Sequence, residues 1–145
     1  MLRKIKNYML CKKFPFLKVR NRFDGKFCGY DFTELDALPR GWYDTFGIAI
    51  CQDIKICLKK SKTKGFVKKY RIAQIKEKWG YLHWYDNGVP SDISKEFYEI
   101  INKYEEISMK TCIKCGKNGK IVNNRGWYEP LCEECKEMIK KSWEK

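Results

Sequence analysis

The chain of 145 residues is 43% hydrophobic and 15% aromatic, which is ample for one buried core or for a core with a small appended module. Thirty-one Lys and Arg against eighteen Asp and Glu give a net charge of +13, an excess that attracts polyanions. The sequence has no run of eighteen apolar residues, and its charged start does not resemble a secretory signal. We therefore expect a cytoplasmic protein without membrane spans.

The excess positive charge belongs to the N-terminal two-thirds of the chain. Residues 1–90 hold 20 Lys and Arg but 8 Asp and Glu, whereas residues 91–145 hold 11 and 10. Of the 31 bases, 25 are Lys, and both the clamping of phosphates and the reading of bases favour Arg. This charge therefore predicts non-specific attraction to a polyanion and not sequence-specific recognition.

The N-terminal stretch 2–12 carries Leu2, Ile5 and Met9 at helical spacing, with basic residues between them. The pattern favours a short terminal helix that docks on the core over an arm that binds nucleic acid. We therefore expect a short helix that is docked on the core.

Asp24-Gly25 is a turn signal between two β-prone stretches, Val19–Phe23 and Lys26–Tyr30, and predicts a hairpin. Four basic residues of this hairpin are the best candidates for a basic patch: Lys18, Arg20, Arg22 and Lys26. Three of them alternate along the strand and so lie on one face. A patch that binds a polyanion and a solvated strand face are both compatible with this pattern.

Thr33 and Asp36 form a capping box at the start of a short helical piece, which Pro39 and Gly41 end. Apolar positions at helical spacing then predict a longer helix from about Trp42 to Lys60, whose aromatic stripe belongs to the core. The basic loop and strand start after this helix complete the candidate anion-binding residues: Lys59, Lys60, Lys62, Lys64, Lys68, Lys69 and Arg71.

Two antiparallel strands are expected at residues 66–78 and 81–85, with Gly80 at the reversal. The second strand alternates, so that one face carries Tyr81, His83 and Tyr85 and the other carries Leu82 and Trp84. The first set lies beside Lys and Arg, a combination that can stack bases. Alternatively helices cover both faces, and burial of every ring is favoured because aromatic side chains dominate cores.

The clearest amphipathic helix runs from about Asp92 to Ser108. It should pack on the sheet through one apolar stripe, formed by Ile93, Phe97, Ile100, Ile101, Tyr104 and Ile107. The three residues 109–111 then lead into the last motif. Because this link is so short, we expect the following segment to dock on this helix and not to swing freely.

The strongest signal in the chain is a pair of Cys-x-x-Cys motifs separated by sixteen residues: Cys112 with Cys115, and Cys132 with Cys135. This spacing is typical of a tetrahedral zinc site, and four thiolates leave no open coordination position, so we expect one structural Zn²⁺. The insert predicts a small β-hairpin or ribbon, and Glu133–Trp143 predicts a terminal helix. The remaining cysteines are expected to be free and mostly buried thiols: Cys11, Cys28, Cys51 and Cys57.

Together these elements predict an α+β fold. A small antiparallel sheet of hairpins packs with two main helices, and a C-terminal zinc-ribbon or knuckle module ends in a helix. The expected domains are residues 1–110, basic and α+β, and residues 111–145, a four-cysteine zinc module docked on the first.

Several stretches resemble a family of small proteins of bacteriophages and prophages: residues 14–23, 32–42 and 70–88, and the cysteine pairs with Gly126-Trp127 between them. The likeness extends from about residue 10 to 140. The family's hairpin usually reads Lys-Glu-Lys, an aromatic residue, Gly-Gly, then Leu-Arg-aromatic-Tyr. This chain has Tyr81 at the second Gly and His83 at the Arg, which puts any role of that arginine in doubt. The resemblance implies a phage or mobile-element protein in a bacterial host cell.

Charge and context predict a non-catalytic, zinc-stabilised protein that binds nucleic acid through its basic N-terminal surface. The alternative is a phage-encoded protein-binding inhibitor or modulator of a host defence complex.

A metal-dependent nuclease is a remote alternative. Glu77 and Lys76 weakly resemble the acid and lysine that such enzymes carry on a β-strand. A metal site would need a second carboxylate, and the nearby candidates, Asp53 and Asp86, are not convincing partners for Glu77. His83 is the single histidine, and no acid or nucleophile lies beside it in the sequence.

Overall fold

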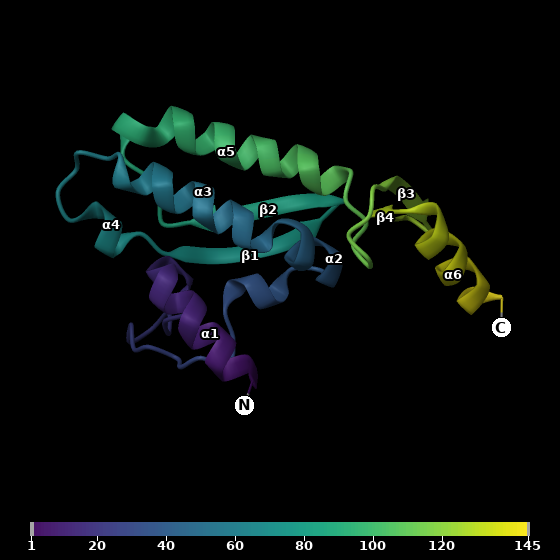
Figure 1. The fold of residues 1–145 in the computed structure, drawn as a ribbon, viewed down its shortest axis with the longest axis horizontal. Coiled ribbons are helices and arrows are strands. Elements are labelled where there is room, and N and C mark those ends of the chain that lie inside the picture. The colour runs from purple at the N-terminus through teal and green to yellow at the C-terminus, as the bar shows by residue number, and fades with distance from the viewer. Residues whose placement is uncertain (1, 145) are drawn as a thin grey trace.

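The computed structural model describes residues 2–144 and confirms the α+β fold (Figure 1). The N-terminal part holds α1 (Leu2–Lys13), the short turns η1 (Pro15–Leu17) and η2 (Glu34–Ala37), and one helical run made of α2 (Arg40–Trp42), η3 (Tyr43–Gly47) and α3 (Ile48–Lys59). It continues with α4 (Phe66–Lys69), the hairpin β1 (Ile72–Lys78) and β2 (Tyr81–Asp86), and α5 (Ser91–Met109). The C-terminal part holds the ribbon β3 (Lys120–Asn124) and β4 (Trp127–Leu131), and then α6 (Glu133–Trp143).

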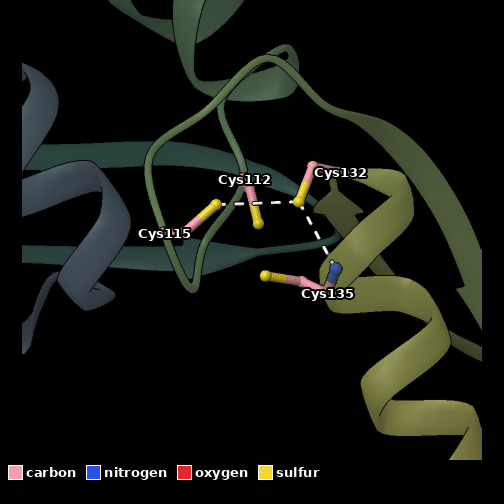
Figure 2. A group of neighbouring side chains, drawn as sticks. All are labelled: Cys112, Cys115, Cys132 and Cys135. Carbon is pink, nitrogen blue, oxygen red and sulfur yellow. Dashed lines mark hydrogen bonds between the residues drawn. The ribbon is translucent and has the colours of Figure 1, made fainter.

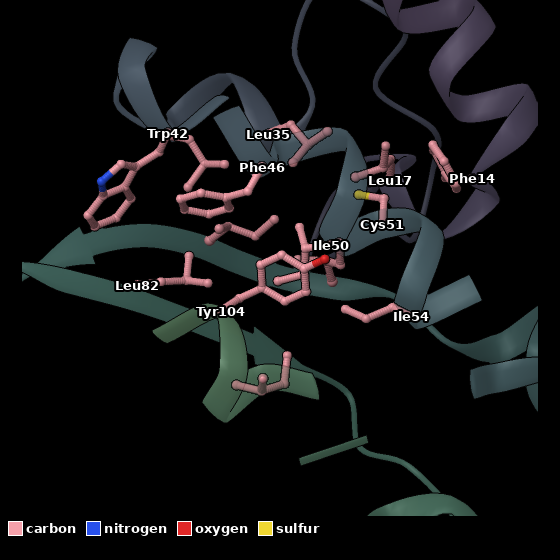
Figure 3. Packing of buried hydrophobic residues seen from close by; sticks show 14 of the residues in the cluster. Phe14, Leu17, Leu35, Trp42, Phe46, Ile50, Cys51, Ile54, Leu82 and Tyr104 are labelled. Carbon is pink, nitrogen blue, oxygen red and sulfur yellow. The ribbon is translucent and has the colours of Figure 1, made fainter. Parts of the chain in front are cut away.

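Helices α3 and α5 lie side by side, and α5 contacts β2 (Figure 1). Buried residues of α3, α5 and β2 pack together on one side of the hairpin, and Figure 3 shows this packing at close range. In the predicted stripe of α5, Ile100 and Ile107 are half-buried and the other four residues are buried: Ile93, Phe97, Ile101 and Tyr104. Ser108, outside that stripe, is buried as well. The stripe meets Leu82 of β2 and the aromatic stripe of the 40–59 helical run in one core.

The predicted helix from Trp42 to Lys60 is confirmed. It contains a turn of π-helix over Tyr43–Gly47, which the apolar pattern did not predict.

The β1–β2 hairpin reverses at Trp79-Gly80, as predicted, and both residues have positive φ, 57° and 90°. A two-residue reversal of this kind matches the right-handed twist of the strands. The first strand starts later than expected, at Ile72, because residues 66–69 form the helical turn α4.

Side chains cover both outer edges of this two-stranded sheet. The Ile75 amide donates to Glu34 Oε2 at 3.5 Å, and the Leu82 amide donates to Ser108 Oγ at 2.9 Å. Each strand is thus partly protected on its open side, which limits pairing with another chain.

Helix α1 forms and docks on the core, as expected, but not through its apolar stripe. Leu2, Ile5 and Met9 are 84%, 57% and 61% exposed, whereas Asn7 and Cys11 are buried. The Asn7 amide donates to the Tyr30 carbonyl at 2.9 Å and to Asp36 Oδ2 at 3.1 Å. These two acceptors satisfy the NH2 group of the Asn7 side chain, whereas its Oδ1 is buried without a partner among residues 2–144. A polar residue thus faces the protein and the apolar stripe faces solvent.

The predicted hairpin over residues 19–30 is reduced to a single bridge between Arg20 and Phe27. The Asn21 side chain accepts from the amides of Phe23 and Asp24 and so winds this segment into a local turn. The strands predicted here are wrong: the segment is an exposed loop without a packed face to support a ladder.

Candidate metal centre and aromatic surface

The four cysteines of the two Cys-x-x-Cys motifs come together at the start of the C-terminal part. Their sulfur atoms all lie within 4.8 Å of one another, and Cys115 Sγ is 3.6 Å from Cys132 Sγ. Figure 2 shows the four side chains pointing toward one centre, two from the loop after α5 and two from the start of α6. A tetrahedral metal with bonds of about 2.3 Å to sulfur holds its ligands about 3.8 Å apart. The cluster therefore fits one metal ion held by four thiolates.

The backbone prepares the first cysteine pair for this role. The Cys112 amide donates to the Lys117 carbonyl at 2.8 Å, and the Gly116 amide donates to the Cys112 carbonyl at 3.0 Å, which closes a tight turn. Gly116 has φ of +81°, a conformation that favours glycine. Burial raises the pKa of the Cys112 thiol, but backbone N–H groups that donate to its sulfur outweigh this effect and lower the pKa to about 7. The thiolate that binds a metal is thus accessible near neutral pH.

The second cysteine pair caps α6. Cys132 is the N-cap, and its sulfur accepts from the Cys135 amide at 3.4 Å. Burial and the neighbouring sulfurs raise the pKa of Cys135. Because four thiolates this close repel one another, the arrangement needs a positive ion to hold all of them ionised.

The first cysteine turn packs on the start of the 40–59 helical run, and strand β4 of the same module contacts α5. The Trp42 indole donates to the Thr111 carbonyl at 2.9 Å, and the Gly41 amide donates to the Ile113 carbonyl at 2.8 Å. A Cβ atom at Gly41 would lie 2.1 Å from the Cys112 carbonyl oxygen.

The short helical piece ends before Pro39, as predicted, but Gly41 lies inside the next helix, where it is a contact point. The division into residues 1–110 and 111–145 stays a prediction. The hydrogen bonds of Gly41 and Trp42 with Ile113 and Thr111 join the two predicted domains. The ends of that division, Met1 and Lys145, lie outside the described residues.

The candidate bases of the 18–26 loop are exposed except for Lys18, which is half-buried. Arg71 immediately precedes β1, at the open end of the β1–β2 hairpin, and the charge of Arg20 in this loop acts on it. The Arg20 Nη1 donates to the Gly25 carbonyl at 3.3 Å. Burial and the Arg20 charge lower the pKa of Arg71. Arg71 donates through Nη1 to the Tyr70 carbonyl at 2.7 Å, while its buried Nε finds no partner among residues 2–144.

The second group of candidate bases lies at the opposite end of the molecule from the cysteine cluster (Figure 1): Lys59, Lys60, Lys62, Lys64, Lys68 and Lys69. All of these lysines are exposed, but α5 places two acids beside their loop. Lys60 pairs with Glu96 at 2.6 Å, and Asp92 accepts from the Lys62 amide at 2.7 Å. Part of the positive charge predicted here is therefore compensated locally.

The expected burial of every ring on the β1–β2 hairpin is wrong. Tyr85 is 44% exposed, and Tyr81 and His83 are half-buried. Since α3 and α5 both cover the face that carries Leu82, they leave the opposite face open. The alternation of the sequence predicts that these rings share one face of the strand. It does not predict which face of the sheet the helices cover.

The open face forms a continuous aromatic surface with lysines beside it. Ring centroids lie 4.3 Å apart for Tyr81 and His83 and 6.2 Å apart for His83 and Tyr85. Lys76 Nζ lies 5.7 Å from the Tyr85 ring, and the register places Lys76 opposite His83. We call Tyr81, His83, Tyr85 and Lys76, together with Lys78 opposite Tyr81, the open sheet face.

The carboxylates considered for a nuclease lie apart in structural roles. Asp53 accepts from the Tyr104 hydroxyl at 2.6 Å, and Asp86 accepts from the Tyr70 hydroxyl at 2.7 Å. Within residues 2–144, the four cysteines form the one group of three or more Cys, His, Asp or Glu placed to share a metal.

No family model, curated protein or solved structure matches this chain. No helix in the described part of the chain is long and apolar enough to cross a membrane.

Proposed function

We propose that the chain is a zinc-stabilised protein that binds nucleic acid without sequence specificity. Zn²⁺ is the ion that best suits four thiolates in a tetrahedral arrangement, with Cys112, Cys115, Cys132 and Cys135 as its ligands. With all four positions filled by protein, the ion has a structural role and supplies no site for a substrate.

Nucleic-acid binding is supported chiefly by the open sheet face. Stacking on exposed aromatic rings is sequence-tolerant, because every base has a π-face, and neighbouring lysines attract the phosphates. His83 and Tyr85 stack at 6.2 Å with an interplanar angle of 24°, and the Tyr85 hydroxyl lies 3.4 Å from His83 Nδ1, which favours some ordering of the two rings before a ligand binds. Such ordering reduces the entropy lost on binding.

Arg20 and Arg71 add a second observation in favour of a phosphate ligand. Two guanidinium groups repel each other, and the Arg20 charge already lowers the pKa of Arg71. Arg71 Nε is buried and has no partner among residues 2–144. A phosphate between the two side chains would accept hydrogen bonds from both and remove the repulsion.

The test is a binding titration of the zinc-loaded chain against single- and double-stranded DNA and RNA over a range of salt concentrations. We expect binding that persists near physiological salt, with an affinity that falls linearly in log salt and a preference among the four ligands. Binding that disappears above roughly 0.1 M salt and is indifferent to the ligand would mean only that a lysine-rich surface meets a polyanion, and would reject the proposal.

A charge-neutralising pair of variants sharpens this test. Arg20→Gln should reduce the slope of log affinity against log salt by about 1, the share of one phosphate contact. Lys60→Gln is the matched control, because Glu96 already lies 2.6 Å from the Lys60 ammonium and compensates its charge. If both variants change the slope equally, net charge alone governs binding and Arg20 is not part of the site.

A host protein complex is the second candidate partner, favoured by α1 and consistent with the resemblance to phage and prophage proteins. Leu2, Ile5 and Met9 form an exposed apolar stripe among basic residues on this helix. The double variant Ile5→Glu/Met9→Glu should then lose a partner that the wild-type chain captures from nuclease-treated host lysate, while it keeps its nucleic-acid affinity. Identical captured proteins from both chains would contradict this alternative.

A further inference from the structure

A cleft of about 400 Å³ lies where the β1–β2 turn meets the β3–β4 ribbon. Three aromatic side chains and two lysines line it: Trp79, Trp127, Tyr128, Lys76 and Lys78. Its volume falls within the range of small-ligand sites, about 300 to 1,000 Å³, and near the lower end. It is therefore large enough for one flat ring system but not for a folded domain.

Close contact between the two hairpins fixes the walls of this cleft. A Cβ atom at Gly80 would lie 3.1 Å from Ile121 Cδ1 and 3.5 Å from the Tyr128 carbonyl oxygen, so the turn packs directly on the ribbon. Trp79 precedes Gly80 at φ of +57°, a conformation rare for a bulky residue. The cleft thus depends on a turn that keeps a tryptophan in an unusual backbone state.

The indoles of this cleft are exposed to an extent that folding alone does not explain. Trp79 is 64% exposed and Trp127 is 69% exposed, although both are among the largest apolar side chains in the chain. Exposed aromatic groups that converge on one cleft indicate a ligand-binding site.

The charge around the cleft favours an anionic ligand. Lys78 Nζ lies 4.3 Å from the centre of the Trp79 ring, and Lys76 lines the same cleft. Glu77 is the acid at the rim, and its carboxylate accepts from the Gly80 amide at 3.0 Å. Flat rings beside lysines complement a base and the phosphates that flank it.

We infer that the cleft holds an unpaired base, so that the protein binds single-stranded nucleic acid in preference to a duplex. In a duplex the π-faces of the bases are stacked on their neighbours, and exposed rings can reach only an unpaired base. The row of aromatic rings continues from the cleft onto the open sheet face, since the Trp79 and His83 rings lie 6.0 Å apart and Tyr85 follows His83. Further bases of the same strand could stack along this row. This inference rests on the proposed function. It adds that the nucleic acid is single-stranded and that one of its bases binds in the cleft.

The experiment measures binding of the zinc-loaded full chain at about 0.15 M salt by fluorescence anisotropy. The probes are a labelled 16-nucleotide strand of mixed sequence, as DNA and as RNA, and the duplex of each with its complement. The variants are Trp79→Ala and Trp127→Ala, with Tyr98→Ala as the control. Tyr98 is 54% exposed on α5, the helix that covers the other face of the sheet. Circular dichroism and zinc content establish that each variant is folded.

We expect Trp79→Ala and Trp127→Ala each to weaken single-strand binding by about 5- to 150-fold, the range for loss of one stacked base. The control should bind like the wild type, and the weaker duplex binding should stay unchanged in all three variants. Quenching of tryptophan fluorescence by the single strand, diminished in either tryptophan variant, is the second readout.

Unchanged single-strand affinity in both tryptophan variants would overturn the inference and leave the proposed function standing. Equal affinity of the wild type for strand and duplex would also overturn it. Failure of the wild type to bind any of the four probes would reject the proposed function itself.

Discussion

Replacement of Cys115 by serine is expected to abolish binding of the proposed zinc ion and to lower the melting temperature by roughly 10 °C or more. Structural zinc contributes about 10 to 16 kcal/mol to small four-ligand sites near neutral pH, and loss of one thiolate removes several kcal/mol of this. The effect should reach beyond the metal, because the Cys112 turn packs on the helix that contains Gly41. Zinc content by mass spectrometry and thermal unfolding by circular dichroism measure the two effects.

Cys28→Ser is the matched control for this variant. Cys28 is an exposed cysteine like Cys115, but it lies in the 18–28 loop, away from the cluster. We expect it to keep one zinc per chain and a wild-type melting temperature. If Cys115→Ser retains its metal and its stability, the four-cysteine site is not the stabilising centre described above.

Gly41→Ala is expected to destabilise the fold by about 3 kcal/mol or more, at the upper end of the cost of overpacking. The added methyl group would meet three backbone atoms of the first cysteine turn: the Cys112 carbonyl oxygen at 2.1 Å, the Gly116 nitrogen at 2.7 Å and the Ile113 carbonyl carbon at 2.9 Å. Backbone atoms cannot swing aside as the end of a flexible side chain can, so the turn or the helix must move. Urea unfolding followed by circular dichroism measures the change in the free energy of unfolding.

Gly47→Ala on the same helical run gives the contrasting result. There the nearest atoms to an added methyl group are side-chain atoms at 3.7 to 3.9 Å, an ordinary contact distance. Alanine is the better helix former by about 0.5 to 1 kcal/mol, so this variant should be as stable as the wild type or slightly more stable. Equal effects of the two substitutions would mean that the contact at Gly41 does not determine the docking of the cysteine turn.

Local patterns in the sequence were enough to predict most secondary elements and the composition of the metal cluster. The spacing of Cys112, Cys115, Cys132 and Cys135 defines two turns that can meet at one ion, and the structure brings their sulfurs within 4.8 Å. The stripe of α5 and the reversal at Gly80 are likewise local signals, and both elements form where expected. In these cases periodicity or turn chemistry alone decides the outcome.

Features that depend on contacts between distant segments were missed. Asn7 faces the protein because Tyr30 and Asp36 supply its acceptors, and these residues lie 23 and 29 positions away. Gly41 is required because Cys112 approaches it, and the open sheet face exists because two helices share the opposite face. No pattern within a short window contains this information. For α1, hydrophobic periodicity pointed to the wrong face, because the two hydrogen bonds that Asn7 Nδ2 donates let a polar side chain take the buried position.

The bond between the Trp42 indole and the Thr111 carbonyl spans 69 positions of the chain, and this separation affects folding during translation. A ribosome adds about 5 to 20 residues per second, so roughly 3 to 14 s pass between synthesis of the two partners. Throughout that interval the indole N–H has no native acceptor, and the helix that carries it lacks the turn on which it packs. The N-terminal part therefore cannot complete its native packing until the last quarter of the chain has been synthesised. Binding of the metal is accordingly a late step in maturation.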